Sequence, residues 1–483
     1  MEADAWSAAF RIPNVLQNLF GDQALSASFI PVYASLVARG ERREADRVAG
    51  AIAALLALVV AILVLVGVVA TPLLIDLIAP GFTGGKRELT TRLVRILFPG
   101  AGLLVLSAWC LAVLNTHQRF FLSYTAPIAW NAAMIATLVA FGGAELPRLA
   151  VAVAWGSVVG SALQFLVQVP SVVRVAPELR FATDTVSEPV RTIGRTFVPV
   201  FVSRGVVQIS AYVDQLLGSL LGTGAVAAIT NAQILSTLPV SLFGMAVSAA
   251  ELPAMSGLTG TDAARHEALR ERLDAGLRQI ALFVVPSAMA FLALGDVVAA
   301  AIFQTGRFTR VDVVYVWGIL AGSAVGLLAS TLGRLYASTY YALGDTRTPL
   351  NCAIVRVALT TALGYLFAIP LPRLFGLASA WGAAGLTASA GVAGWVEMLL
   401  LRARLNARIG RTGLPLGFTV RLWTSAGAAA AVAWLVKLTM PLSGPIAIGV
   451  VVLGLYGVVF LAATIAMRVP EASATIGRFI RRI

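Results

Sequence analysis

Charge is scarce in this 483-residue chain: Asp, Glu, Lys and Arg make up 12% of its residues, whereas soluble domains have about 25%. Hydrophobic residues make up 59%. A soluble protein of this length has too little buried volume to hide that much Leu, Val and Ala, which excludes a soluble fold. Cysteine is scarce as well. Cys110 and Cys352 both lie in apolar surroundings, so the sequence implies neither a disulfide framework nor a metal-binding pair.

Histidine is equally rare, with His117 and His266 both in short loops among arginines. Membrane hydrolases and acyltransferases usually need a histidine or a carboxylate cluster near the bilayer surface. The sequence also has no glycine-rich phosphate loop of the kind found in ATP-driven pumps. Catalysis is therefore poorly supported. A membrane-embedded glycosyl- or acyltransferase stays an alternative, which mutation of His117, His266 and Asp345 would test.

Long apolar runs take the place of charge, as at 49–78, 93–114 and 445–467. Each is long enough to cross the hydrocarbon, which takes about 20 residues, and no alternating pattern typical of barrel strands recurs. We therefore predict an all-α polytopic membrane protein. The thirteen expected spans are 4–37, 47–78, 89–115, 119–143, 147–173, 188–221, 224–258, 272–304, 311–343, 349–371, 376–403, 416–440 and 443–468.

Lysine is nearly absent, since 34 of the 36 basic residues are arginine, and these alternate between loops. One set of loops, at 39–47, 119, 174–195, 265–278, 347, 402–411 and 468–482, holds 22 basic residues. The other set holds 8, namely Lys86, Arg87, Arg92, Arg95, Arg148, Arg307, Arg310 and Arg373. This asymmetry is typical of the positive-inside rule and predicts that the first set and the C-terminus lie in the cytoplasm. The net charge of +13 is thus a topology signal, and we expect no nucleic-acid partner.

An internal sequence repeat indicates that the chain has two similar halves. Residues 19–31 read LFGDQALSASFIP, and residues 242–253 read LFGMAVSAAELP. Pro80-Gly81-Phe82-Thr83 and the turn at 115–119 have counterparts at 306–309 and 344–347, at a similar offset. Such a repeat in an apolar chain is typical of two bundles related by an internal axis, as in many transporters.

The halves are not equally complete. In the second half, the span 188–221 precedes the Leu-Phe-Gly helix, and nothing corresponds to it in the first half. We therefore expect an N-lobe at 1–174 that lacks its first helix, a C-lobe at 188–404, and a terminal helix pair with a cytoplasmic tail at 405–483. A natural thirteen-helix protein is the alternative.

Ionisable residues inside the spans are the candidate functional residues, because burying them is costly. Asp4, Arg11 and Asp22 lie in the first span, and Asp4 and Arg11 share a helix face because they are about two turns apart. Pro13 is expected to interrupt that helix, as at many transport sites. A solvated, frayed terminus is the alternative for Asp4 and Arg11.

The second half offers further candidates, Arg204, Asp214 and Glu251 within spans and Arg278 at the start of one. Packing pairs are the alternative role for the first three, and a cytoplasmic flank for Arg278. Arg334 and Arg356 are expected to reach the interface from helix ends. The glycines of two helices, Gly156, Gly160, Gly322 and Gly326, are spaced for close backbone approach.

An arginine-lined cavity between two bundles suits an anionic substrate, because guanidinium groups bind phosphate oxygens bidentately and strongly at low dielectric. Long apolar flanks would accept a lipid tail. From these residues alone, the expectation is a transporter of an anionic or amphiphilic molecule.

Several motifs carry a family resemblance. Residues 4–16 (DAWSAAFRIPNVL), continuing into 19–22 and 26–32, resemble the MurJ/MviN family of lipid II flippases, and so do 341–349 (YALGDTRTP), 79–82 and 114–116. The resemblance covers essentially the whole chain. It implies a MATE-like fold of the MOP superfamily with fourteen helices: two six-helix lobes and a terminal pair that forms a groove for a polyprenyl tail.

The resemblance also implies export of lipid II, the lipid-linked peptidoglycan precursor, across the bacterial inner membrane by alternating access without ATP hydrolysis. Asp4, Arg11, Asp22 and Arg278 would match charged positions of the family's cavity and gates. We assign substrate contacts to Arg11, Asn14, Arg204 and Arg278, and gate or ion-coupling roles to Asp4, Asp22, Asp214 and Glu251. Lipid II and membrane lipids are the expected partners of a monomer with no cofactor beyond an unidentified coupling cation.

The chain departs from the family in two places. Gln17 and Asn18 stand where the family usually has an arginine. The family's first helix, which contributes further cavity arginines, is expected to be absent from this chain. The alternatives are therefore a multidrug or oligosaccharide-lipid exporter of the same superfamily, the membrane-embedded transferase named above, and a pseudo-transporter that acts as a scaffold.

Overall fold

The computed structural model describes residues 2–179, 187–248, 251, 255, 262–343, 345, 347–376, 378–439 and 444–472, and every regular element in these ranges is a helix. Ten of the described helices are long and apolar enough to cross a membrane, and they coincide with ten of the thirteen expected spans. The other three expected spans, 4–37, 119–143 and 188–221, are also helical. The all-α membrane fold is confirmed.

Contacts divide the chain into two compact units, residues 1–227 and 228–483, which are described separately below. This division groups residues by packing. The lobes expected from the repeat, 1–174 and 188–404 with a terminal part at 405–483, stay a prediction.

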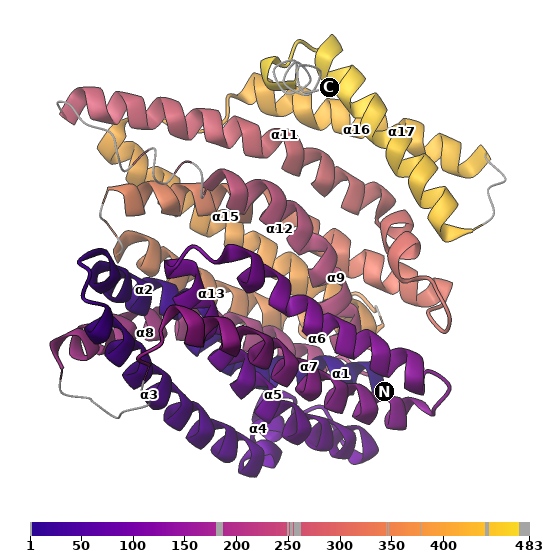
Figure 1. The fold of residues 1–483 in the computed structure, drawn as a ribbon. Coiled ribbons are helices and arrows are strands. Elements are labelled where there is room, and N and C mark those ends of the chain that lie inside the picture. Colours follow the sequence, from indigo (N-terminus) through magenta and orange to yellow (C-terminus); the bar gives the residue numbers. More distant parts are fainter. Residues whose placement is uncertain are drawn as a thin grey trace. The chain divides into compact units, whose positions relative to one another are not determined.

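The first unit is a bundle of eight helices and the start of a ninth among the described residues, drawn from indigo to magenta in Figure 1. In chain order they are α1 (Glu2–Phe20), α2 (Asp22–Ala38), α3 (Arg42–Val69), α4 (Thr71–Ile78), α5 (Gly84–Thr116), α6 (Phe120–Phe141), α7 (Leu146–Val175), α8 (Glu188–Ser219) and the beginning of α9 (Ala225–Pro239).

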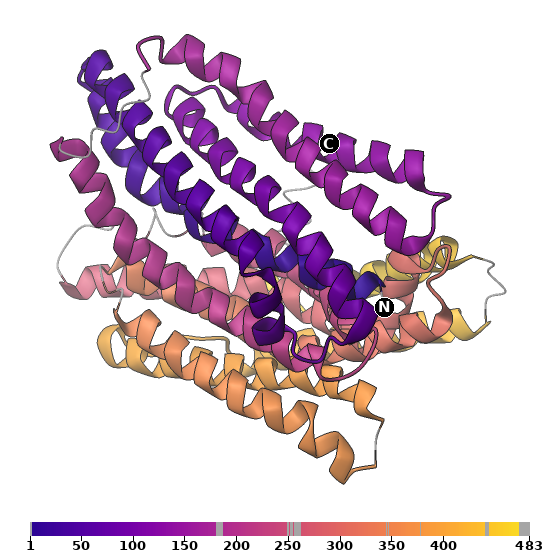
Figure 2. The same ribbon diagram turned by 90° about the horizontal axis from the view of Figure 1, so that it is seen from below.

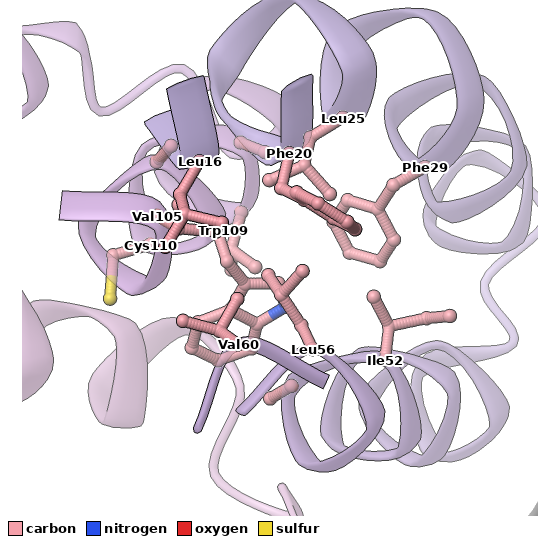
Figure 3. Close-up of a cluster of buried hydrophobic side chains, with 14 of the residues drawn as sticks. Leu16, Phe20, Leu25, Phe29, Ile52, Leu56, Val60, Val105, Trp109 and Cys110 are labelled. Carbon is pink, nitrogen blue, oxygen red and sulfur yellow. The ribbon is translucent and has the colours of Figure 1, made fainter. Parts of the chain in front are cut away.

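Helix α5 is the centre of this unit, because it packs against α1, α2, α3 and α7. Its buried side chains, Val105 and Trp109 among them, meet Leu16 and Phe20 of α1 and Leu56 of α3 (Figure 3). Cys110 lies in the same cluster as a free, buried thiol, so its expected packing role is confirmed. This core holds α1 in place along most of its length.

The first expected span is two helices, with the break at Gly21 rather than at Pro13. Helix α1 runs unbroken from Glu2 through Pro13 to Phe20, so the prediction that Pro13 interrupts the helix is wrong. A Cβ on Gly21 would lie 2.2 Å from the carbonyl oxygen of Gln17. Only glycine fits that turn, and the chain bends there into α2.

The second unit, drawn from magenta to yellow in Figure 1, contains the remaining described helices. These are the rest of α9, η1 (Val240–Met245, a π-helix), α11 (Asp262–Phe303), α12 (Arg310–Ala342), α13 (Arg347–Ala368), α14 (Pro370–Leu374), η2 (Ser379–Trp381, a 3₁₀ turn), α15 (Gly382–Ile409), α16 (Leu416–Thr439) and α17 (Pro445–Ala466).

Helix α12 packs between α11 and α15, and α13 covers α15; the orange pair α13 and α15 lies side by side in Figure 2. The terminal pair α16 and α17 packs on α11. A capping box starts α12, in which Thr309 and Asp312 each accept from the other's backbone N–H. Pro445 in the first turn and Gly444 at φ +100 start α17.

The glycines singled out in the sequence do mark close helix contacts. A Cβ on Gly326 of α12 would lie 2.3 Å from the Cα of Gly391 on α15, and one on Gly322 would lie 2.4 Å from the carbonyl oxygen of Ala384. In the first unit, Gly156 and Gly160 of α7 meet α6. The prediction of close backbone approach is confirmed at Gly160, Gly322 and Gly326, whereas Gly156 packs against the side chain of Thr137.

Candidate functional site

The best-satisfied charged group of the first unit is the carboxylate of Asp4. It is fully buried, and it accepts hydrogen bonds from Lys86 Nζ at 2.6 Å, Gly224 N at 2.6 Å and Ala227 N at 3.0 Å. Gly224 directly precedes α9 and Ala227 lies in its first turn, where the partial positive charge of the helix end favours a carboxylate. Asp4 therefore ties α1 to both α5 and α9, and it is not part of a frayed terminus.

The loop between α4 and α5 completes this arrangement. Lys86 Nζ lies 4.0 Å from the ring centroid of Phe82, which gives a cation–π contact. Gly81 N donates to Ser219 Oγ at the end of α8, and a Cβ on Gly81 would lie 2.0 Å from the Ser219 carbonyl oxygen. We call Asp4, Lys86, Gly81, Phe82 and Ser219 the Asp4 seal, because together they close one end of the first unit.

Two turns along α1, Arg11 meets α8. Its guanidinium donates to Gln215 Oε1 at 3.3 Å and interacts electrostatically with the Asp214 carboxylate. Asp4 and Arg11 thus both contact the chain between residues 214 and 227, as expected for residues on one face of α1. The structure brings Asp4, Arg11 and Asp214 into the same unit, with Asn14 half-buried one turn further on.

The opposite end of the first unit carries the arginine-rich loops. There, His117 Nε2 lies 2.9 Å from Tyr33 Oη, and Asp46 accepts from Glu178 N at 3.1 Å. Burial is the main cause that lowers the pKa of His117. The imidazole is therefore largely neutral at pH 7, and its contact with Tyr33 indicates a packing role.

The second unit has an apolar groove of about 310 Å³ where α9 and η1 meet α11 and α17. Its lining includes Leu235, Leu242, Phe243, Phe291, Leu453 and Tyr456. Phe243 stacks on Phe283 at 4.4 Å between ring centroids, and Tyr456 Oη donates to the Pro286 carbonyl oxygen at 2.7 Å. The ring stack fixes η1 against α11, and the hydrogen bond fixes α17 against α11. The lining is mostly apolar, so the groove suits an alkyl chain.

Arg278 lies on α11, eight residues before Pro286, or about 12 Å of helix rise. Its side chain is 41% exposed, and its Nη1 lies 3.7 Å from Glu471 Oε1, a loose ion pair. Among the described residues, the buried Nε of Arg278 has no hydrogen-bond partner. One helix of this unit therefore carries both an arginine with a spare donor and one wall of an apolar groove.

The structure says less about the roles of the other predicted site residues. The side chains of Asp22 and Arg204 lie outside the described part of the structure, so their assignments stay predictions. Glu251 accepts from Arg272 at 2.9 Å in the second unit. Arg356 donates to Glu397 at 3.0 Å between α13 and α15, and the expectation that it reaches the interface stays a prediction.

The described residues contain no group of three or more His, Cys, Asp or Glu that could hold a metal ion. The unidentified coupling cation stays a prediction.

Sequence reasoning missed three residues of the first unit. The sequence presents Lys86 only as a loop charge, and it does not distinguish Gln215 or Ser219 from other polar residues. One signal was present for Lys86: it is one of two lysines among 36 basic residues. Gln215 and Ser219 give no such signal, because their role depends on which helix packs beside α8.

Comparison with known proteins gives a consistent result. The family model described as lipid II flippase MurJ matches residues 1–466. A lipid II flippase MurJ from Burkholderia cenocepacia is 32% identical over 411 residues, covering 84% of this chain and 77% of that protein. A probable lipid II flippase MurJ from Haemophilus influenzae is 30% identical over 382 residues, covering 76% and 74%.

Solved structures agree in fold. A lipid II flippase MurJ in an inward closed conformation aligns with a TM-score of 0.78 at 21% identity, covering 97% of this chain and 93% of that one. An inward-facing MATE multidrug transporter of the MOP superfamily aligns with a TM-score of 0.66 at 17% identity, covering 84% and 94%. At such identities the likeness concerns the fold alone. The family match over residues 1–466 does carry the assignment: this chain belongs to the MurJ family of lipid II flippases.

Proposed function

We propose that this chain moves lipid II across the bacterial inner membrane by alternating access. The observation that carries the proposal is the match of the lipid II flippase family to residues 1–466. The curated relatives named above are lipid II flippases or probable ones, and the ten apolar helices suit a multi-pass membrane protein. A transport role, rather than an enzymatic one, follows from the same membership.

The two chemical parts of such a substrate have matching features in the second unit. A diphosphate carries several acceptor oxygens, and the Arg278 side chain is 41% exposed and held only by a loose ion pair with Glu471 at 3.7 Å. A polyprenyl tail is apolar, as is the groove between α9, η1, α11 and α17. In this proposal Arg278 contacts the diphosphate and the groove receives the tail, while Arg11 of the first unit stays a predicted substrate contact.

The proposed orientation places the arginine-rich loops and the C-terminus in the cytoplasm. The positive-inside rule supports it, because the two sets of loops hold 22 and 8 basic residues. The Asp4 seal lies at the end of the first unit opposite to the His117 end, so it faces outward. In this account the seal closes the outer side while substrate enters from the cytoplasm, and Asp4 and Asp214 are gate residues.

Lipid binding by the purified chain tests the proposed contacts. In native mass spectrometry, we expect lipid II to bind in preference to organic cations, and Arg278→Gln and Arg11→Gln each to weaken lipid II at least about tenfold, the loss expected for a charge-assisted contact. Arg411→Gln is the matched control, because Arg411 is exposed and outside the proposed site. Preferential binding of organic cations would contradict the proposal and favour a multidrug exporter.

A further inference from the structure

A cluster of two cations around one carboxylate lies in the second unit. It is near the C-terminal end of α11, away from Arg278. Asp296 of α11 is 2% exposed at its side chain, and it accepts from Arg310 Nη2 at 2.7 Å and from Lys437 Nζ at 2.7 Å. Arg310 opens α12 and Lys437 lies near the end of α16. Because two cations share one carboxylate, the cluster keeps an excess positive charge.

The cluster opens onto a cavity of about 370 Å³. Asp296, Arg310, Lys437 and Gln304 form its polar part, and Val297, Ala300, Ile448 and Val452 form its apolar part. The Arg310 side chain is 57% exposed, and a guanidinium has five N–H donors. Both cations therefore keep donors for a ligand while Asp296 holds them in position.

The first turn of α17 borders the same cavity through Gly444 and Pro445. Among the described residues no side chain caps this helix end, so the N–H groups that follow Pro445 have no side-chain acceptor there. A helix N-terminus carries about half a positive charge, which adds to that of Arg310 and Lys437. Three independent sources of positive potential thus meet at one side of an apolar cavity.

The residues around the cavity are of the kinds found at a membrane surface. Trp434 Nε1 donates to the Ala293 carbonyl oxygen at 3.0 Å, and Lys437 Nζ lies 5.3 Å from the Trp434 ring centroid. Tryptophan beside a cation is typical of the belt where lipid headgroups lie. Nearby, Ile302, Ile446 and Val450 are 52%, 62% and 70% exposed, which suits contact with acyl chains.

We propose that this cavity binds an anionic phospholipid, with its phosphodiester on Arg310 and Lys437 and one acyl chain along Ile448 and Val452. Basic pockets between membrane helices bind anionic headgroups in this way. A zwitterionic lipid is disfavoured, because its own cation meets the positive cluster. The site is separate from the groove and Arg278 proposed for transport. It joins α11, α12, α16 and α17 through the bound lipid.

The test compares phosphatidylglycerol with phosphatidylcholine on the purified full chain by native mass spectrometry. The triple variant Asp296→Asn, Arg310→Gln, Lys437→Gln removes both cations without stranding a buried carboxylate. We expect the triple variant to bind phosphatidylglycerol at least about tenfold more weakly, with phosphatidylcholine binding unchanged.

Asp296→Asn alone frees both cations, so this variant should bind phosphatidylglycerol as tightly as the wild type does, or more tightly. This single variant tests the proposal even where the triple variant does not fold.

Arg307→Gln is the matched control, because Arg307 is exposed on the same loop but does not line the cavity, and phosphatidylglycerol binding should not change. Equal wild-type affinity for the two phospholipids would overturn the proposal, as would unchanged phosphatidylglycerol binding by the triple variant or a tenfold loss in Asp296→Asn. A triple variant that loses undecaprenyl diphosphate but keeps phosphatidylglycerol would also overturn it, and would assign the site to the transported lipid.

Discussion

At the scale of single residues, Asp4 has the clearest role, because its buried carboxylate serves three donors at once. Asp4→Asn leaves the Lys86 ammonium nearly buried without a counter-charge, which should cost about 3–5 kcal/mol of unfolding free energy. Lys86→Met should lower the unfolding free energy by less, because the Asp4 carboxylate keeps two backbone N–H donors at the start of α9. Thermal unfolding of the purified variants measures both.

The double variant Asp4→Asn, Lys86→Met completes this cycle. Residues in direct contact are not independent, so its cost should be smaller than the sum of the two single costs. Strictly additive costs would show that the Asp4–Lys86 pair contributes no coupling, contrary to the geometry.

Asp345 explains what one family motif does in the fold. Its carboxylate accepts from the N–H groups of Arg347 and Thr348 and from Thr348 Oγ1, and so caps α13; it also pairs with Arg408 of α15 at 2.7 Å. The hydrogen bonds from Thr348, followed by Arg408, lower the pKa of Asp345 to about 2. The capping residue of the motif 341–349 thereby anchors two helices.

The lowered pKa of Asp345 predicts a pH dependence with a definite sign. The folded value is below the unfolded one of about 4, so the carboxylate stabilises the fold above pH ~4, and this contribution is lost as the pH falls toward about 2. Thermal unfolding of the wild type and of Asp345→Asn should therefore differ most above pH ~4 and converge below it. A difference that grows on acidification would contradict the assignment.

At the scale of elements, close packing of α12 on α15 depends on Gly326 and Gly391. Gly326→Val places new atoms into the facing backbone, which should cost about 1–3 kcal/mol or more. Gly454→Val is the matched control on α17, because a Cβ at Gly454 meets nothing within 4 Å. In thermal unfolding, Gly326→Val should have a clearly lower melting temperature than Gly454→Val. Equal melting temperatures would show that α12 and α15 move apart without cost.

Most elements could be predicted from apolar run length, since thirteen expected spans are all helical in the described residues. The break at Gly21 could not, because proline at 13 is the stronger local signal, yet packing of α1 on α5 keeps the helix intact there. Site residues were predictable where a charge falls inside a span, as with Asp4 and Arg11. Their partners were not, because Lys86, Gln215 and the N–H groups of α9 become neighbours only through tertiary packing.

At the scale of the whole molecule, the proposed alternating access requires the Asp4 seal to open. Ala8 lies fully buried behind it with Ala79, Phe82 and Val226. In a background where Cys110 and Cys352 are alanine, we expect Ala8→Cys to react slowly with a membrane-impermeant maleimide added to intact spheroplasts. Adding Asp4→Asn should speed that labelling. Unchanged labelling would show that the seal does not gate access to this position.

The most direct test of the account is the accessibility of lipid II on the outer face of cells depleted of their own flippase. Expression of this chain should restore accessible lipid II to the level given by the endogenous protein, and Arg278→Gln should fail to restore it while reaching the membrane in equal amount. The account is contradicted if the chain reaches the membrane at that level and lipid II still remains on the cytoplasmic face.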